Sequence, residues 1–236
     1  MVQEEKGKTV KATLPYCLAT ALALAAPVTA QAGSPDGKVQ VKLLMSGVLT
    51  DGQIDAVRVD KIGVPAGTQT KANDNWVPTA ALEYFLSPNI SVETICCFTA
   101  HHVDGAGAVA GVSHLIDDVL ILPATLTLKA HATGLGPIKP YGGAGPSYFI
   151  VLDSKVGAGG KALGAASAKL RSKVGVALQA GVDVALNDKG LGLTLDAKRH
   201  FMRPLASFYT ATGVEALSTR HKLDPWVLSA GLAYRF

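Results

Sequence analysis

The sequence predicts an all-β fold: an eight-stranded antiparallel transmembrane β-barrel with short periplasmic turns and long extracellular loops. Three observations lead to this prediction. Eight stretches alternate between apolar and other residues with the period of two that is typical of β-strands. The connections between them alternate between short and long, as in outer-membrane barrels. After residue 32, no segment holds the run of about 18 uncharged apolar residues that a membrane-spanning helix needs.

The first 32 residues have the features of a secretory signal peptide. Lysines precede an apolar run over residues 14–30, and Ala30-Gln31-Ala32 supplies the small-x-small pattern of a cleavage site. We therefore expect a signal peptide over residues 1–32 and a barrel over residues 33–236. The alternative is a membrane anchor, but the run is short for a span and Pro15 and Pro27 interrupt it.

The composition of the remaining chain excludes several classes of protein. The net charge of the whole chain is only +4 and the basic residues are not clustered enough for a nucleic-acid surface. Cys96 and Cys97 are adjacent, so they provide no disulfide framework. On a strand they point to opposite faces and cannot readily share a metal ion. We read them as two small strand residues.

The predicted strands are long enough to cross a bilayer, because a tilted strand needs about 9–11 residues. They are Lys38–Thr50, Trp76–Ser87, Ile90–Val103, Val119–Ala132, Ile138–Asp153, Lys173–Leu186, Leu191–Met202 and Trp226–Phe236.

Short turns built from Pro, Asn, Asp and Gly connect these strands at residues 87–89, 133–137 and 187–190. The connections at residues 51–75, 104–118, 154–172 and 203–225 are long and are polar or rich in glycine. This places both termini of the barrel chain on the periplasmic side and the long loops outside the cell.

The two faces of the strands differ in chemistry. One face is almost purely apolar and suits lipid, whereas the other carries charges of both signs that can pair across a narrow lumen. A soluble, lipocalin-like barrel with its apolar face inside is the alternative. The expected lumen network consists of Lys42, Glu83, Glu93, Lys129, Asp183, Asp196, Lys198 and Arg235.

Closure explains the pattern of the last strand. In hydrocarbon every backbone N–H and C=O must be bonded internally, so the last strand must pair with the first. Amphipathic aromatic rings are favoured at the two membrane–water boundaries. The expected boundary aromatics are Trp76, Tyr84, Tyr148, Trp226, Tyr234 and Phe236.

Four segments, in order along the chain, resemble the OmpW family. They are Trp76-Val77-Pro78-Thr79 with the turn that follows its strand, residues 122–131 (LPATLTLKAH), residues 139–145 (KPYGGAG) and the closing segment 224–236. The resemblance implies an eight-stranded outer-membrane barrel with a narrow, partly hydrophobic lumen. The family includes AlkL-like members linked to uptake of alkanes and other small apolar compounds, which are thought to leave sideways through the barrel wall. The terminal Phe236 also resembles the signal that barrel-assembly machinery recognises.

The chain departs from the family pattern at several positions. Ala124 stands in place of a second proline, and Ala130 and Ala132 stand where tyrosine and phenylalanine are usual. Pro146 falls inside the fifth predicted strand, where it removes a backbone donor. We expect a local kink or bulge there, and a lateral gap is the alternative. The period-two alternation puts six apolar side chains on the inward face of the strands, where they would line the lumen. They are Leu44, Val77, Phe85, Ile95, Ile121 and Phe149.

Other motifs carry no site. His101, His102 and His114 flank the second long loop and His221 lies in the fourth. The nearest serine–histidine pair, Ser113-His114, lacks the third group that a nucleophilic site needs. Two glycine-rich stretches, residues 105–110 and 157–162, match a relaxed nucleotide-binding pattern but open no helix of a βαβ unit. We therefore expect no catalytic residues, no cofactor and no metal.

The sequence favours a passive conduit for small hydrophobic molecules in the outer membrane. The expected partners are outer-membrane lipid, the assembly machinery and the solutes, with no nucleic acid, and the oligomeric state stays open. A charged plug in the periplasmic half would block a water pore and send apolar solutes sideways. The alternatives are a closed barrel whose loops bind partners and a narrow ion-conducting pore.

Overall fold

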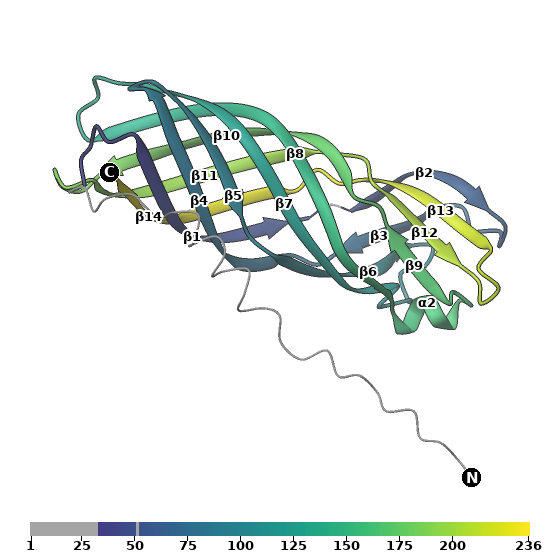
Figure 1. The fold of residues 1–236 in the computed structure, drawn as a ribbon. Coiled ribbons are helices and arrows are strands. Elements are labelled where there is room, and N and C mark those ends of the chain that lie inside the picture. The colour runs from purple at the N-terminus through teal and green to yellow at the C-terminus, as the bar shows by residue number, and fades with distance from the viewer. Residues whose placement is uncertain (1–32, 51) are drawn as a thin grey trace, which may run out of the picture. The chain divides into compact units, whose positions relative to one another are not determined.

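Eight long antiparallel strands close into a barrel in the computed structural model, which describes residues 33–50 and 52–236 (Figure 1). The predicted signal peptide, residues 1–32, lies outside the described residues. In spatial order the strands are β1 (Val39–Leu49), β4 (Asn75–Ser87), β5 (Ile90–Cys96), β7 (Ile116–His131), β8 (Ile138–Val156), β10 (Lys173–Ala185), β11 (Leu191–Phe201) and β14 (Trp226–Arg235).

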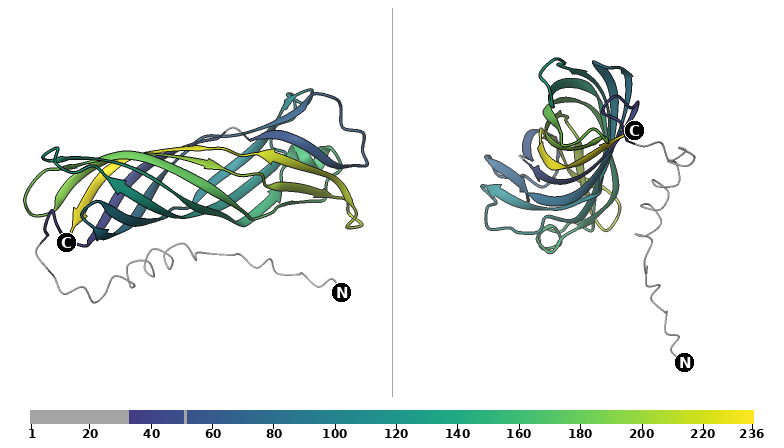
Figure 2. Two further views of the ribbon diagram at one scale, coloured as in Figure 1. Left: turned by 90° about the horizontal axis from the view of Figure 1, so that it is seen from above. Right: turned by 90° about the vertical axis from the view of Figure 1, so that its left-hand side faces the viewer.

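The last strand pairs with the first and closes the ring. The register between β1 and β14 runs without a break from Gln40 opposite Arg235 to Leu49 opposite Trp226. The view along the barrel in Figure 2 shows the strands as a ring. The closed ring of paired strands confirms the predicted eight-stranded antiparallel barrel. Such a ring pairs the backbone N–H and C=O groups within the protein, as lipid requires.

Tight turns join the strands at the end of the barrel that also holds the C-terminus (Figure 1). In the turn between β10 and β11, Asn187 Oδ1 accepts hydrogen bonds from the backbone N–H groups of Lys189 (2.9 Å) and Leu191 (3.1 Å). Gly190 has φ +78°, and a Cβ there would lie 2.0 Å from the carbonyl oxygen of Arg235. Glycine is therefore needed at this position.

Side chains alternate between the interior and the outside along each strand. Burial in β4 switches at almost every residue, with Trp76, Leu82 and Tyr84 exposed. Exposed large apolar side chains recur on seven of the eight barrel strands, all but β5, which gives the outward apolar band of a membrane barrel.

None of the helices in the described part of the chain is long and apolar enough to span a membrane.

The long connections are more ordered than the sequence predicted. Instead of loops, they hold the four-stranded sheet of β2 (Gln53–Asp60), β13 (Glu215–Lys222), β12 (Leu205–Tyr209) and β9 (Ser167–Leu170), together with β3 (Thr68–Ala72), β6 (Thr99–Gly107) and the short helix α2 (Ala158–Ala162). These elements gather at the end of the barrel opposite the C-terminus (Figure 1). These elements are structured and not irregular because some of their apolar side chains pack into a core shared with the barrel. Its members are Leu115, Ile116, Val119, Ile121, Phe149, Ala168, Met202 and Ala206.

The expected third strand, Ile90–Val103, is divided. It forms β5 and β6, and Cys97 and Phe98 belong to neither. The neighbouring ladders stop at Ala80 opposite Cys96 on one side and at Ile95 opposite Thr125 on the other.

Pro146 produces neither a bulge nor a lateral gap. The register between β8 and β10 continues through Pro146 opposite Val176. The ladder between β7 and β8 skips two pairs and then resumes in the same register, from Thr125 opposite Ser147 to Leu128 opposite Ala144. The strands stay close, since a Cβ on Gly145 would lie 1.9 Å from the Leu126 carbonyl oxygen. The missing N–H of proline thus interrupts the ladder without separating the strands.

Candidate functional site: a charged plug beneath an apolar chamber

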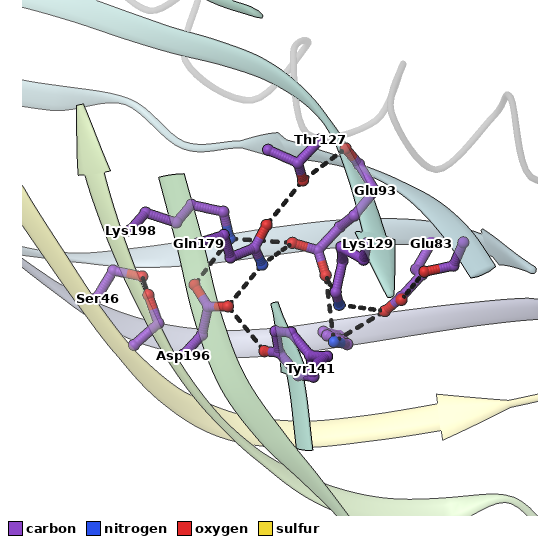
Figure 3. A network of polar contacts seen from close by, with 12 residues as sticks. Ser46, Glu83, Glu93, Thr127, Lys129, Tyr141, Gln179, Asp196 and Lys198 are labelled. Carbon is purple, nitrogen blue, oxygen red and sulfur yellow. Dashed lines mark hydrogen bonds and ion pairs between the residues drawn. The ribbon is translucent and has the colours of Figure 1, made fainter. Parts of the chain in front are cut away.

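A network of charged side chains fills the periplasmic half of the barrel interior (Figure 3). Lys42 and Lys129 each place Nζ 2.9 Å from Glu83 Oε2, and both also reach Glu93 Oε2, at 3.2 and 2.8 Å. Lys198 bridges Glu93 (3.0 Å) and Asp196 (2.8 Å). We call Lys42, Glu83, Glu93, Lys129, Asp183, Asp196 and Lys198 the plug.

The four carboxylates of the plug come from three different places in the ring. Glu83 and Glu93 face each other across β4 and β5, Asp183 lies on β10 and Asp196 on β11. Asp183 Oδ1 lies 3.3 Å from Lys42 Nζ, so the network spans the lumen. The structure therefore brings together seven of the eight residues that the sequence placed in a lumen network.

Neutral side chains that the sequence reasoning missed complete the plug. Gln179 donates to Glu93 Oε1 (2.8 Å) and to Asp196 Oδ2 (2.6 Å), and accepts from Thr127 (2.7 Å). The Tyr141 hydroxyl donates to Asp196 Oδ2 (2.7 Å), and Lys129 Nζ lies 3.7 Å from the centre of its ring. All three occupy the inward phase of their strands, which was the available signal. Their polar groups reduce the cost of the buried charges.

Arg235, the eighth predicted member, lies below the plug. Its guanidinium carbon is 3.5 Å from the centre of the Phe85 ring and its Nε donates to the Gly37 carbonyl (2.6 Å). The Phe85 ring also packs 5.1 Å from that of His131, whose Nε2 is 3.0 Å from Glu83 Oε1. Phe85 is therefore part of the periplasmic end of the barrel.

An apolar chamber lies on the other side of the plug, toward the extracellular elements. Its space not filled by atoms is about 790 Å³, including the part open to solvent. Its lining is mainly apolar and comes from the barrel and the extracellular elements. The lining includes Val48, Ala72, Val103, Ile116, Val119, Ile121, Pro123, Phe149, Leu170, Ala206, Leu223 and Val227.

Two histidines border the chamber with their polar atoms occupied. His101 Nδ1 lies 2.8 Å from the Asn73 carbonyl and its Nε2 lies 2.8 Å from Thr99 Oγ1. His221 Nε2 lies 2.8 Å from Thr219 Oγ1. Burial lowers the pKa of His221, which lies in the extracellular sheet, so its ring is held neutral. Because their ring nitrogens have partners in the protein, these histidines add little polar surface to the chamber.

The barrel wall is interrupted beside the chamber. Between the pair Ala80–Cys96 and the pair Ala72–Val103, no ladder joins β4 to β5 or β6 in the described chain. We call the facing segments, residues 76–79 and 97–100, the window. Near its outer end, Asn75 Nδ2 donates to the Ala100 carbonyl (2.9 Å), and the backbone N–H of His102 donates to Asn73 Oδ1 (2.7 Å). Unpaired backbone is unfavourable in lipid, so a window at membrane depth marks a weak seam.

The six residues predicted to line a hydrophobic lumen do not form one gate. Ile121 and Phe149 line the chamber, whereas Phe85 lies beyond the plug. Val77 and Cys97, one from each side of the window, pack together with Val48 and Val227. Leu44 and Ile95 are buried one inward position beyond Lys42 and Glu93. An alternating phase shows which side chains face inward but leaves their height along the barrel undetermined.

The predicted boundary aromatics form two groups. Trp76 and Trp226 are exposed at the extracellular ends of β4 and β14, and Tyr148 is exposed opposite Val174, the second residue of β10. Tyr84 and Tyr234 are exposed at the periplasmic ends, and Phe236, half-buried, packs 6.0 Å from Tyr234.

Comparison with known proteins gives the chain its family. The sequence profile of the OmpW family matches residues 35–236. The chain is 34% identical over 212 residues to the uncharacterized outer-membrane protein y4mB of Sinorhizobium fredii, covering 89% of this chain and 85% of that protein. It is 28% identical to the dibenzothiophene metabolism operon protein PahQ of Pseudomonas aeruginosa, covering 73% of this chain and 77% of PahQ.

Two solved structures share the fold. The outer-membrane protein OprG of Pseudomonas aeruginosa superposes with a TM-score of 0.75 at 24% identity, covering 86% of this chain and 98% of OprG. The outer-membrane protein AlkL superposes with a TM-score of 0.68 at 23% identity, covering 87% and 93%. The family match, the closed barrel and its outward apolar band together place the protein in the outer membrane. The chain belongs to the OmpW family of outer-membrane proteins.

Proposed function

We propose that the protein is a passive conduit for small hydrophobic molecules, which enter the apolar chamber from outside, stop at the plug and leave sideways through the window. The observation that carries the proposal is the position of the apolar chamber, directly above a closed charged plug and beside an interrupted wall. A relative from a dibenzothiophene metabolism operon supports an apolar solute. We expect no catalytic activity.

The plug and the chamber both favour an apolar solute over a polar one. A solute that continues straight through the lumen must disrupt buried ion pairs such as Lys129–Glu83, and breaking one buried pair costs about 3–5 kcal/mol. A solute that leaves toward lipid exchanges one apolar environment for another. A polar solute gains nothing in the chamber and loses its hydration there.

A crosslink across the window tests the route. Continuing the register from Ala80 opposite Cys96 places Thr79 opposite Cys97, and both side chains are buried. Directly opposed Cβ atoms lie about 4.5–5.5 Å apart, close to disulfide geometry. Thr79→Cys therefore allows the native Cys97 to lock β4 to the segment between β5 and β6.

A matched lock uses the same cysteine on the other side. Continuing the register from Ile95 opposite Thr125 places Pro123 opposite Cys97, so Pro123→Cys locks that segment to β7 instead. We expect oxidised Thr79→Cys to lose uptake of a medium-chain alkane relative to its own reduced form. Pro123 lines the chamber, so Pro123→Cys is likewise compared with itself, and its oxidised and reduced forms should take up the alkane at equal rates. If the Pro123→Cys lock alone blocks uptake, the exit lies toward β7. If neither lock changes uptake, the solute does not leave by this route.

A further inference from the structure

The extracellular elements around the chamber form two halves. One half is the paired sheet of β2, β13, β12 and β9, and the other consists of β3, β6 and the outer parts of β7 and β8, which pair with one another. In the described chain, no backbone ladder joins β2 to β3 or β9 to β8. We call these two edges, where the halves meet, the β2–β3 seam and the β8–β9 seam.

Polar side chains close the β2–β3 seam. At Ile54 the side chain of Gln69 takes the place of a backbone partner, since its Oε1 accepts from the Ile54 N–H (2.8 Å) and its Nε2 donates to the Ile54 carbonyl (3.3 Å). Nearer the membrane, Thr70 Oγ1 donates to the Gly52 carbonyl (2.7 Å). We call Gln69 and Thr70 the clasp.

Apolar packing joins the halves at the β8–β9 seam, in addition to a bond from Ser154 Oγ to the Ala168 carbonyl (3.4 Å). The extracellular core takes Ala168 and Ala206 from one half and Ile116 from the other. Among the described residues, none of the core's members lies on β2 or β3. Opening the β8–β9 seam would therefore expose apolar surface to water, whereas the bonds of the clasp can be exchanged for bonds to water at little cost.

The chamber extends to the β2–β3 seam, because Thr50, Gly52 and Ala72 at the membrane side of this seam all line the chamber. We propose that the β2–β3 seam is the entrance through which apolar solutes reach the chamber, that the clasp holds it closed, and that the β8–β9 seam acts as the hinge. The inference rests on the proposed function, since it names the place where the solute of that conduit enters. Closure by the clasp between entries keeps the apolar lining away from bulk water.

A disulfide across the entrance tests the proposal. An ideal Cβ on Gly52 lies 3.5 Å from the Ala72 Cβ, within the range of about 3.5–4.5 Å for disulfides. Gly52→Cys with Ala72→Cys therefore locks the β2–β3 seam, in a barrel whose native cysteines are replaced by Cys96→Ala and Cys97→Ala. Gly52 has φ +47°, which is unfavourable for cysteine, so the folded band on a gel is verified first.

A matched lock crosses the other seam. Continuing the register from Phe149 opposite Lys173 places Ser154 opposite Ala168, so Ser154→Cys with Ala168→Cys locks the β8–β9 seam in the same cysteine-free barrel. Each locked variant is compared with its own reduced form in uptake of a medium-chain alkane. We expect oxidation to abolish uptake through the first variant and to leave uptake through the second unchanged.

A second measurement does not depend on uptake. Ala72 is only 8% exposed, so the thiol of Ala72→Cys should react with a water-soluble maleimide mainly when the seam opens. Gln69→Ala removes both bonds of its side chain and should speed this reaction by about two- to tenfold. Thr68→Ala is the matched control, because it removes a bond of 2.8 Å to the Pro65 carbonyl on its own side of the seam, and it should leave the rate unchanged.

The outcomes separate this inference from the proposed function. Uptake that survives oxidation of the first lock shows that the solute enters elsewhere, although the conduit itself stands. Loss of uptake with the second lock, alone or together with the first, contradicts a hinge at the β8–β9 seam. Equal labelling rates in Gln69→Ala and Thr68→Ala overturn the clasp. If the unchanged barrel takes up no alkane, it is the proposed function that fails.

Discussion

Replacing Lys129 with methionine should destabilise the barrel far more than replacing an exposed lysine in an ion pair of the same length. Lys129 Nζ lies 2.9 Å from Glu83 Oε2, and neither side chain is exposed. Lys155 Nζ lies 2.9 Å from Asp118 Oδ2, but these side chains are 61% and 65% exposed. Removing one partner of a buried pair costs about 3–5 kcal/mol, because the other charge is left without compensation. An exposed pair contributes about 0–1 kcal/mol.

The assay is unfolding by urea in lipid vesicles, followed by the fluorescence of the two tryptophans. We expect Lys129→Met to lower the free energy of unfolding by about 3–5 kcal/mol and Lys155→Met by less than about 1 kcal/mol. Adding Glu83→Gln to Lys129→Met removes one charge of each sign and should recover part of the loss. A loss below about 1 kcal/mol for Lys129→Met would refute a plug held together by buried charge.

Three further predictions follow from single features. Acidification below the ordinary histidine pKa of 6.5 should destabilise the extracellular sheet. Burial lowers the pKa of His221, so the unfolded chain takes up the proton first. Amide hydrogen exchange in β13 should become faster at low pH, and this change should be absent in His221→Gln. Gly145→Val should prevent barrel formation, since its Cβ would lie 1.9 Å from the Leu126 carbonyl oxygen, and failure of the folded band to appear on a gel checks this. Filling the chamber with Ala72→Phe should slow uptake of an apolar solute, whereas Ala162→Phe, at an exposed position outside both the chamber and the window, should not. Equal rates would contradict a route through the chamber.

The barrel could be predicted from the sequence because period-two alternation and turn residues are local signals. The same phase also identified the plug lysines and carboxylates, since charges on an inward face must pair with one another. Gln179 and Tyr141 were missed because a neutral polar side chain on the inward face, unlike a charged one, does not require an oppositely charged partner. Their role depends on register, which brings Gln179 on β10 within reach of Asp196 on β11.

The extracellular sheet and the window could not be predicted for a different reason. The strands of the sheet are short and come from three separate connections, so their pairing is decided by packing on a common core that includes Phe149 and Ala206. The window depends on where two ladders stop, and nothing in the alternation around Cys97 marks that position. Pro146 was a misleading signal, because the register of its neighbours holds the strands together.

Uptake by cells tests the central claim most directly. The mature barrel is expressed in an outer membrane that lacks its own hydrophobic conduits, and uptake of a medium-chain alkane is compared with that of a polar solute of similar size. A closed plug beneath an apolar chamber predicts faster uptake of the alkane alone. Faster uptake of both solutes would contradict the plug and indicate a water-filled pore. Unchanged uptake of both would contradict the conduit and indicate a closed barrel whose extracellular elements bind partners.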